Sequence, residues 1–360
     1  MTMPSPSATT PQWQAVHDAL MSGGVQSSLD GPLGSRTTYR VGGKAAVIAE
    51  VSSFDDLLHV SRVIRGYSLT HVLVVGNGSN MLVSDSGYNG LAIVLNSVGP
   101  EEISLDDDGS VVVSGHVSLP QMARQSVTAH RCGLEWAVGV PGTVGGAVRM
   151  NAGGHGSDMA ASVIDVVIVD ILAGRVARVG ARDLGLRFRA SALGGQHLVT
   201  SVRLATENAE HDEGRSAHDG KSCNDEISEI VRWRREHQPG GQNAGSVFVN
   251  PGTDTKSAGA LIDAAGLRGL RMETAVVTEK HANFIQSDPD GRADDVVTLM
   301  CRVQDVVQQR HGIRMRSEVT LVGFDPKISA RFADEIRHDP NVVRAQDKLE
   351  AIVAGGDQVL

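Results

Sequence analysis

Short runs of alternating or β-branched apolar residues, separated by turn residues, predict strands along the first two thirds of the chain. The predicted strands span residues 40–51, with a glycine turn inside this strand, and residues 71–75, 92–95, 111–114, 163–169, 176–179 and 198–204. Apolar positions with helical spacing predict helices at residues 12–21, 54–64 and 119–133. Strands interspersed with these helices indicate an α+β region over residues 25–205.

A second, smaller α/β region is predicted over residues 226–324. Its pattern predicts helices at residues 227–236, 257–265 and 293–311 and strands at residues 275–278, 283–286 and 313–321. Residues 206–225, between the two regions, are polar and acidic and are expected to form a solvated insertion. Residues 1–24 are predicted to be a tail with a short helix, and residues 325–360 a charged, helix-compatible extension of unknown role.

Composition and charge exclude several classes of function. The chain has 360 residues, 41 glycines and a net charge of −9, so no basic face for nucleic acid is expected. Small anionic ligands are compatible with this charge, because single arginines can dominate the local field. The sequence shows neither a secretory signal nor an apolar run of about 18 residues. A cytoplasmic protein without membrane insertion is therefore expected.

The three cysteines give no sign of a disulfide framework or a metal site. Cys132, Cys223 and Cys301 lie far apart in the sequence, and no CxxC pair is present. This usage predicts free thiols, a reducing compartment and no bound metal.

A first glycine-rich loop, Gly76-Asn77-Gly78-Ser79-Asn80, follows the predicted strand at residues 71–75. A strand that ends in small residues exposes successive backbone N–H groups, which can hold a phosphate. The loop departs from the dinucleotide fingerprint, because Met81 occupies the sixth position and no helix is predicted after it. A hairpin turn is an equally open interpretation of this loop alone.

A second glycine-rich segment is denser, with eight glycines in the 24 residues from 133 to 156. Glycine costs about 0.5–1 kcal/mol in regular structure relative to alanine, so such density indicates a close approach of the backbone to a flat or charged ligand. A purely structural glycine-rich turn is the alternative.

The two segments resemble the flavin-binding signatures of the UDP-N-acetylenolpyruvoylglucosamine reductase family, and residues 37–43 resemble its early TT-x-R-x-GG stretch. The resemblance covers roughly residues 30–324, in the family's order. It implies an FAD-binding domain of the vanillyl-alcohol-oxidase type at residues 25–205, with two α+β subdomains split near residue 97, and a smaller α/β substrate-binding and catalytic domain at residues 226–324. The cofactor-binding residues that it implies are Arg40, Gly42, Gly43, Gly76, Asn77, Gly78, Ser79, Asn80, Gly139, Pro141, Gly142, Gly145, Gly146, Ala147, Asn151, Ala152 and Gly153.

Three further positions resemble the catalytic set of this family. They are Arg189 in LRFRAS, Ser246 in AGSVFVNP and Glu318 in SEV, the last on a predicted strand. The resemblance implies that FAD, reduced by NADPH, reduces the enolpyruvyl ether of UDP-N-acetylglucosamine enolpyruvate to give UDP-N-acetylmuramate for peptidoglycan. The arginine and a protonated glutamic acid would stabilise charge at the carboxylate, and the serine would protonate the α-carbon.

Each of these residues also has a structural interpretation when taken alone. Arg189 suits an exposed strand, Ser246 could bond the backbone of its own turn, and Glu318 could pair across a strand with a neighbouring arginine. Their joint occurrence in matching motifs favours the catalytic interpretation.

Arg234, Arg235 and Asn250 are the candidates for holding the UDP portion of the substrate, with a solvated helix end as the alternative for the arginine pair. The chain departs from the family at Phe188, where tyrosine is usual, and at Val249, where lysine is common. A monomer is expected. A flavin-dependent alcohol oxidase of the same fold and a non-catalytic UDP-sugar-binding module are the alternative functions.

Overall fold

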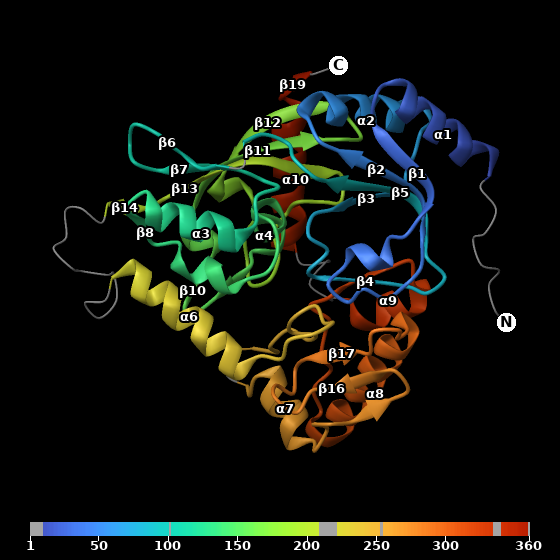
Figure 1. Cartoon of the computed structure of the whole chain (residues 1–360), viewed down its shortest axis with the longest axis vertical. Coiled ribbons are helices and arrows are strands. Elements are labelled where there is room, and N and C mark those ends of the chain that lie inside the picture. The colour runs from blue at the N-terminus through green and yellow to red at the C-terminus, as the bar shows by residue number, and fades with distance from the viewer. Residues whose placement is uncertain (1–9, 101, 209–221, 253–254, 334–339, 359–360) are drawn as a thin grey trace.

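The computed structural model describes residues 10–100, 102–208, 222–252, 255–333 and 340–358. A four-stranded sheet with the order β1-β2-β5-β3 forms the N-terminal part. Its strands are β1 (Gln26–Gly31), β2 (Ala45–Val51), β3 (Val72–Val75) and β5 (Tyr88–Leu95). Helices α1 (Pro11–Ser22) and α2 (Phe54–Gly66) bury their apolar positions against this sheet (Figure 1). The Ser53 side chain, which accepts from Asp56 N, caps α2 at its start.

A second sheet has six strands in the order β19-β12-β11-β13-β7-β6. They are β6 (Ser104–Leu105), β7 (Val111–Ser114), β11 (Val163–Asp170), β12 (Arg175–Gly180), β13 (His197–Leu204) and β19 (Asp357–Gln358). Helices α3 (Leu119–Thr128), α4 (Val144–Met150) and α10 (Pro340–Ala354) share one apolar core with this sheet. The C-terminal extension therefore adds a helix and an edge strand to this part of the molecule (Figure 1).

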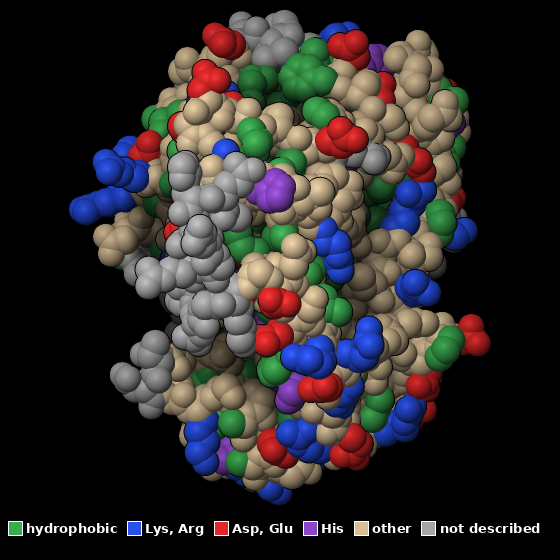
Figure 2. All heavy atoms as spheres, turned by 60° about the vertical axis from the view of Figure 1, so that its left-hand side comes forward, with side chains coloured by type: hydrophobic (Ala, Val, Ile, Leu, Met, Phe, Trp, Pro, Cys, Tyr) green, Lys and Arg blue, Asp and Glu red, His purple; other side chains and the backbone are tan. Residues whose placement is uncertain are grey.

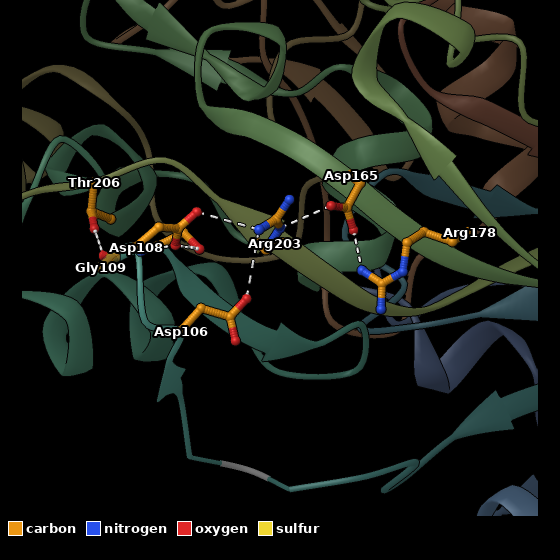
Figure 3. Close-up of polar contacts among 8 residues, drawn as sticks. Asp106, Asp108, Gly109, Asp165, Arg178, Arg203 and Thr206 are labelled. Atoms are coloured by element: carbon orange, nitrogen blue, oxygen red, sulfur yellow. Dashed lines mark hydrogen bonds and ion pairs between the residues drawn. The ribbon is translucent and has the colours of Figure 1, made fainter.

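An ion-pair network on β13 holds the hairpin of β6 and β7 against the sheet (Figure 3). Arg203 Nε donates to Asp165 Oδ2 at 2.8 Å, and Arg203 Nη1 lies 3.3 Å from Asp108 and 3.7 Å from Asp106. Asp165 also pairs with Arg178 on β12 at 2.5 Å. Since Asp165 is buried on β11, its two arginines supply the partners that a buried carboxylate needs.

The third part, drawn in orange at the bottom of Figure 1, packs the antiparallel sheet β15-β16-β17 against helix α8 (Ala293–His311). The strands of this sheet are β15 (Arg271–Met272), β16 (Ala275–Val277) and β17 (Ile285–Ser287), and α7 (Ala258–Ala264), β18 (Thr320–Val322) and α9 (Pro326–Phe332) complete this part. Helix α6 (Cys223–His237) precedes it and packs into the core of the six-stranded sheet. Strand β18 pairs in parallel with β4 (Met81–Val83), so two segments far apart in the sequence lie side by side directly after the first glycine loop. On the face shown in Figure 2, basic and acidic side chains are interspersed over this part.

Short elements complete the described chain. They are η1 (Gly34–Arg36), β8 (Arg131–Cys132), η2 (Glu135–Gly139), β9 (Gly153–Gly154), β10 (Ser157–Asp158), α5 (Met159–Ser162), η3 (Ala181–Asp183) and β14 (Glu207–Asn208). Among the helices that the structure describes, none is both long and apolar enough to cross a bilayer.

Several predicted elements have different bounds. The strand predicted at residues 313–321 is regular only from Thr320, so Glu318 lies in a bend rather than on a strand. The helix predicted at residues 119–133 ends at Thr128, because the positive φ at His130 and Gly133 turns the backbone away. The strand predicted at residues 40–51 begins only at Ala45. Strands β1 and β4 were not predicted, because their short runs lack clear alternation.

The segment predicted as a solvated insertion at residues 206–225 is ordered at both ends. Glu207 and Asn208 form β14, which pairs with β8, and Cys223 begins α6. The rest of this segment and the tail at residues 1–9 lie outside the described residues.

The prediction of three free cysteines is wrong for two of them. Cys132 and Cys223 form a disulfide with a Cα–Cα distance of 6.0 Å, and Cys301 is free. The two half-cystines are 91 residues apart and meet only because the start of α6 packs beside β8. Spacing along the sequence carries no signal for such a tertiary contact.

Candidate active site

The two glycine-rich segments line one pocket, together with the end of α6 and parts of the third region. Ser79 Oγ donates to Pro141 O at 3.0 Å and joins the two segments. A Cβ placed on Gly76 would lie 2.7 Å from Thr143 Oγ1, and one on Gly142 would lie 3.0 Å from Ser79 Oγ. Glycine is therefore required where the segments approach each other.

The first loop presents a run of unpaired backbone donors. Asn77, Gly78, Ser79 and Asn80 donate no backbone hydrogen bond to any residue in the described part of the chain. Successive free N–H groups of this kind form a cradle for an anion such as a phosphate. The hairpin alternative is excluded, because β3 pairs with β5 whereas β4 pairs with β18.

The second segment contains a helix, α4, which the sequence had predicted only as loop. Its N-cap is Thr143, whose side chain accepts from Gly146 N. Gly146 and Ala147 face the pocket from this helix, and apart from the helix backbone and the adjacent residues only Thr143 Oγ1 lies within 4 Å of a Cβ built on Gly146. Small residues on an accessible backbone suit a flat ring system with a phosphate-bearing tail, and FAD has this shape.

Eleven of the predicted cofactor residues line this pocket. They are Gly76, Asn77, Gly78, Ser79, Asn80, Pro141, Gly142, Gly146, Ala147, Ala152 and Gly153, which we call the glycine wall.

Six other predicted cofactor residues, Arg40, Gly42, Gly43, Gly139, Gly145 and Asn151, do not line it. A Cβ on Gly42 would lie 2.1 Å from Val83 O, so Gly42 permits chain packing behind the wall. Gly145 N donates to Gly115 O and anchors α4. Arg40 lines a separate pocket that also includes Asn77.

Arg189, Ser246 and Glu318, which we call the reacting groups, reach the same pocket from three segments far apart in the chain. Arg189 Nε lies 3.0 Å from Glu318 Oε1, with side-chain exposures of 25% and 19%. The exposed-strand interpretation of Arg189 is therefore wrong, and the ion pair of Glu318 is made with Arg189, a residue far away in the sequence.

A tight turn holds Arg189. The backbone of Arg187 and Ala190 exchanges two hydrogen bonds across the turn, and Arg189 has the left-handed φ of 55°. From the side of the pocket, Asn151 Nδ2 donates to Arg187 O at 3.0 Å and Ser191 Oγ donates to Arg149 O at 2.7 Å. Asn151 thus orients the arginine turn instead of lining the pocket.

Burial raises the pKa of Glu318 above its ordinary value, while Arg189 and Arg316 partly oppose this shift. The segment is fixed on both sides, because Asn80 Nδ2 donates to Glu318 O at 2.9 Å and Glu318 N donates to Val247 O at 2.8 Å. The backbone of Glu318 is therefore tied to the glycine wall and to the residue after Ser246.

Ser246 lies in an irregular stretch after Gly245, whose φ of 77° requires glycine or a strained residue. Val247 N donates to Asn283 O, and Asn283 Oδ1 accepts from Phe248 N at 3.0 Å, which fixes the segment. No described residue hydrogen-bonds the Ser246 hydroxyl, so the hydroxyl is free to serve a ligand.

Of the three predicted substrate-binding residues, one lines the pocket and two do not. Arg234 lines the pocket and is half-buried, whereas Arg235 is exposed and outside it. Asn250 is also outside, and its Oδ1 accepts from Ala258 N at 2.9 Å near the start of α7. Arg149 also lines the pocket, and the sequence analysis missed it. Its position inside the glycine-rich segment was a signal that could have identified it.

Comparison with known proteins agrees with this geometry. Residues 45–180 match a profile described as FAD binding domain, and residues 237–322 match one described as UDP-N-acetylenolpyruvoylglucosamine reductase, C-terminal domain. A protein of Symbiobacterium thermophilum named UDP-N-acetylenolpyruvoylglucosamine reductase 2 is 39% identical over 82% of this chain and 92% of its own length.

A reductase of the same name, from Synechococcus sp. strain RCC307, is 37% identical over 82% of this chain and 93% of its own length. The crystal structure of UDP-N-acetylenolpyruvylglucosamine reductase from Thermus caldophilus is similar with a TM-score of 0.67 and 31% identity, over 83% of this chain and 98% of that one.

Proposed function

Since the chain belongs to the UDP-N-acetylenolpyruvoylglucosamine reductase family, we propose that Arg189, Ser246 and Glu318 are the groups with which it reduces its substrate. The protein is an FAD-dependent oxidoreductase of peptidoglycan-precursor synthesis, a UDP-N-acetylmuramate dehydrogenase. The observation that carries the assignment of residues is that all three line one pocket with the glycine wall.

The glycine wall would hold FAD, with the free N–H groups of Asn77, Gly78, Ser79 and Asn80 toward its phosphates. When bound, FAD supplies hydride transfer from the nicotinamide donor to the substrate. We take NADPH as that donor. Donor and substrate occupy the pocket in turn.

Arg189 binds the carboxylate of the enolpyruvyl group. As the β-carbon of this group accepts hydride, negative charge develops on its α-carbon and carboxylate. The Arg189 guanidinium stays protonated at any working pH. Because it lies beside Glu318, the guanidinium and a protonated Glu318 can both donate hydrogen bonds to the substrate carboxylate. The raised pKa of Glu318 favours that protonated form.

Ser246 donates its proton to the α-carbon. A serine hydroxyl is a weak acid, so this role requires a hydroxyl that is not committed to another bond and a pocket that excludes bulk water. The Ser246 hydroxyl has no partner among the described residues, and its side chain is half-buried. Transfer of this proton from the serine oxygen to the α-carbon neutralises the negative charge there and completes the reduction, and the serine oxygen then regains a proton from water.

Arg234, at the end of α6, binds the diphosphate of the UDP portion. Arg235 and Asn250 do not line this pocket. We place the enzyme in the cytoplasm as a monomer, and we keep the division into an FAD-binding domain at residues 25–205 and a substrate-binding domain at residues 226–324.

Two mixing experiments test the function. NADPH should bleach the absorbance of the purified yellow protein, and the enolpyruvyl substrate should then restore it without oxygen. Bleaching by NADPH with no return on adding substrate would contradict the reductase function. In a flavin oxidase, the absorbance would return only when oxygen is added. A non-catalytic sugar-binding module would bind no flavin.

A further inference from the structure

The C-terminal helix α10 packs directly outside the turn that carries Arg189. This helix lies beyond residues 45–180 and 237–322, which match the family profiles. It contacts β12 and η3, the two elements that precede the turn in the sequence. The role of the extension can therefore be sought at this contact.

The apolar face of α10 supports both ends of the Arg189 turn. Leu349 and Val353 are fully buried in one core with Leu184, Ala192 and Leu193. Residues 184 and 192 are also joined by a backbone hydrogen bond of 2.8 Å, from Ala192 N to Leu184 O, which closes the loop on which Arg189 lies. The helix thus buries the base of this loop.

A close contact joins the helix to the start of the loop. A Cβ built on Gly185 would lie 2.9 Å from the Ala345 Cβ, so the helix and the loop leave no room for a larger side chain here. Gly185 has a φ of 55°, which only glycine adopts without strain. Movement of Ala345 would be transmitted to the loop backbone four residues before Arg189.

Polar contacts also hold α10 against residues on either side of the loop that carries Arg189. Lys348 Nζ pairs with Asp183 Oδ1 at 2.5 Å. Glu350 Oε1 accepts from Gln196 Nε2 at 2.9 Å and lies 3.5 Å from His197 Nε2. These partners precede and follow the loop, so α10 is tied to both of its ends.

On the pocket side, the turn is held by the Arg189–Glu318 ion pair and by single hydrogen bonds. Asn151 and Ser191 each provide one hydrogen bond, while Phe188 is 55% exposed and Arg189 has a left-handed backbone. A non-glycine residue in this conformation costs about 1–2 kcal/mol and persists only when its surroundings hold it. The outer face supplied by α10 provides that support.

We propose that α10 is a positioning element for Arg189: it braces the 184–193 loop from outside so that the guanidinium stays beside Glu318 and the substrate carboxylate. This inference rests on the proposed role of Arg189. Ala345 and Lys348 act through the loop and touch neither substrate nor cofactor.

Ala345→Leu tests the proposal, with Ala351→Leu on the exposed face of the same helix as its matched control. The larger side chain should press on Gly185 and displace the loop. Reoxidation of the NADPH-reduced enzyme by the enolpyruvyl substrate should slow by about 10- to 100-fold, since a displacement of about 1 Å is enough for such a loss. Reduction by NADPH and flavin content should stay within about twofold of wild type. The control should change neither rate.

Equal losses in both half-reactions, loss of flavin, or unchanged rates in Ala345→Leu would each overturn the proposal. Lys348→Met, at an exposed position, removes the ion pair with Asp183 without threatening the fold and should show the same selective loss at a smaller size. If Ala345→Leu does not fold, Lys348→Met decides on the same criterion. A wild-type enzyme that the substrate cannot reoxidise would instead refute the proposed function.

Discussion

The glycine wall and the reacting groups line the same pocket but are built differently. The wall comes from two contiguous segments and offers backbone donors and small side chains. The reacting groups are one arginine, one hydroxyl and one carboxyl group from three segments, held by contacts such as Asn151 to Arg187 O and Asn80 to Glu318 O. Binding a large cofactor is thus a property of local chain conformation, whereas the chemistry depends on long-range packing.

This difference predicts that damage to the wall removes flavin, whereas damage to a reacting group leaves flavin bound and stops one half of the reaction. The variants below test that separation.

The largest effect is expected from a variant that puts a large side chain into the pocket lined by the glycine wall. Gly146→Leu would place a side chain in the pocket, because apart from the helix backbone and the adjacent residues only Thr143 Oγ1 lies near a Cβ at this position. The purified variant should be colourless and inactive, as measured by flavin absorbance per mole of protein. Gly180→Leu is the control, since nothing lies within 4 Å of its Cβ. Stoichiometric flavin in Gly146→Leu would show that this wall is not the cofactor site.

Replacing Arg189 should separate the two halves of the reaction. Arg189→Ala should slow reoxidation by substrate by about 10²–10³-fold, the usual loss when one group that stabilises developing charge is removed. Arg189→Lys keeps the charge but lacks the fork geometry and should recover only part of this loss. Single-turnover mixing measures both rates. A matching loss in the reduction by NADPH would argue that Arg189 holds the wall instead.

Glu318 should give the reaction a pH limit. The proposed role requires its protonated form, and burial raises its pKa, so the rate of reoxidation should be highest below that pKa and fall as the pH rises through it. Glu318→Gln keeps a hydrogen-bond donor that does not ionise, and it should lose no more than about tenfold at neutral pH while removing the fall at high pH. The pH profile of single-turnover reoxidation checks this, and an unchanged high-pH limb in Glu318→Gln would assign the limit to another group.

A smaller effect distinguishes two adjacent arginines. Arg234→Ala should raise the KM for the UDP-sugar by about tenfold, the loss expected for one charge-assisted contact. Arg235→Ala should change it by less than about twofold, because Arg235 is exposed and outside the pocket. Steady-state kinetics at fixed NADPH compares the two. Equal effects would place the diphosphate over the helix end instead of inside the pocket.

The glycine wall and the reacting groups also differ in how far the sequence predicts them. The glycine loops were identified from contiguous residues, although helix α4 inside the second segment was missed because its Gly145 and Gly146 suggested loop. Arg189, Ser246 and Glu318 were found only through the resemblance to a family. Composition and spacing favoured structural roles for each of them, because their meeting depends on the packing of segments that are far apart.

Other features that the sequence did not predict have the same origin. The Cys132–Cys223 disulfide and the contact of α10 with the Arg189 loop depend on tertiary packing over long separations in the chain. Glu318 was placed on a strand because charged and apolar residues alternate there, but its backbone bends to bring the carboxyl group to Arg189.

The central claim is that a proton donor separate from the glycine wall completes the reduction. The direct measurement is stopped-flow absorbance of Ser246→Ala, first mixed with NADPH and then with the enolpyruvyl substrate. Reduction by NADPH should stay within about twofold of wild type, while reoxidation slows by about 10²–10⁴-fold, the range for loss of a positioned general acid. Reoxidation at the wild-type rate would contradict the account.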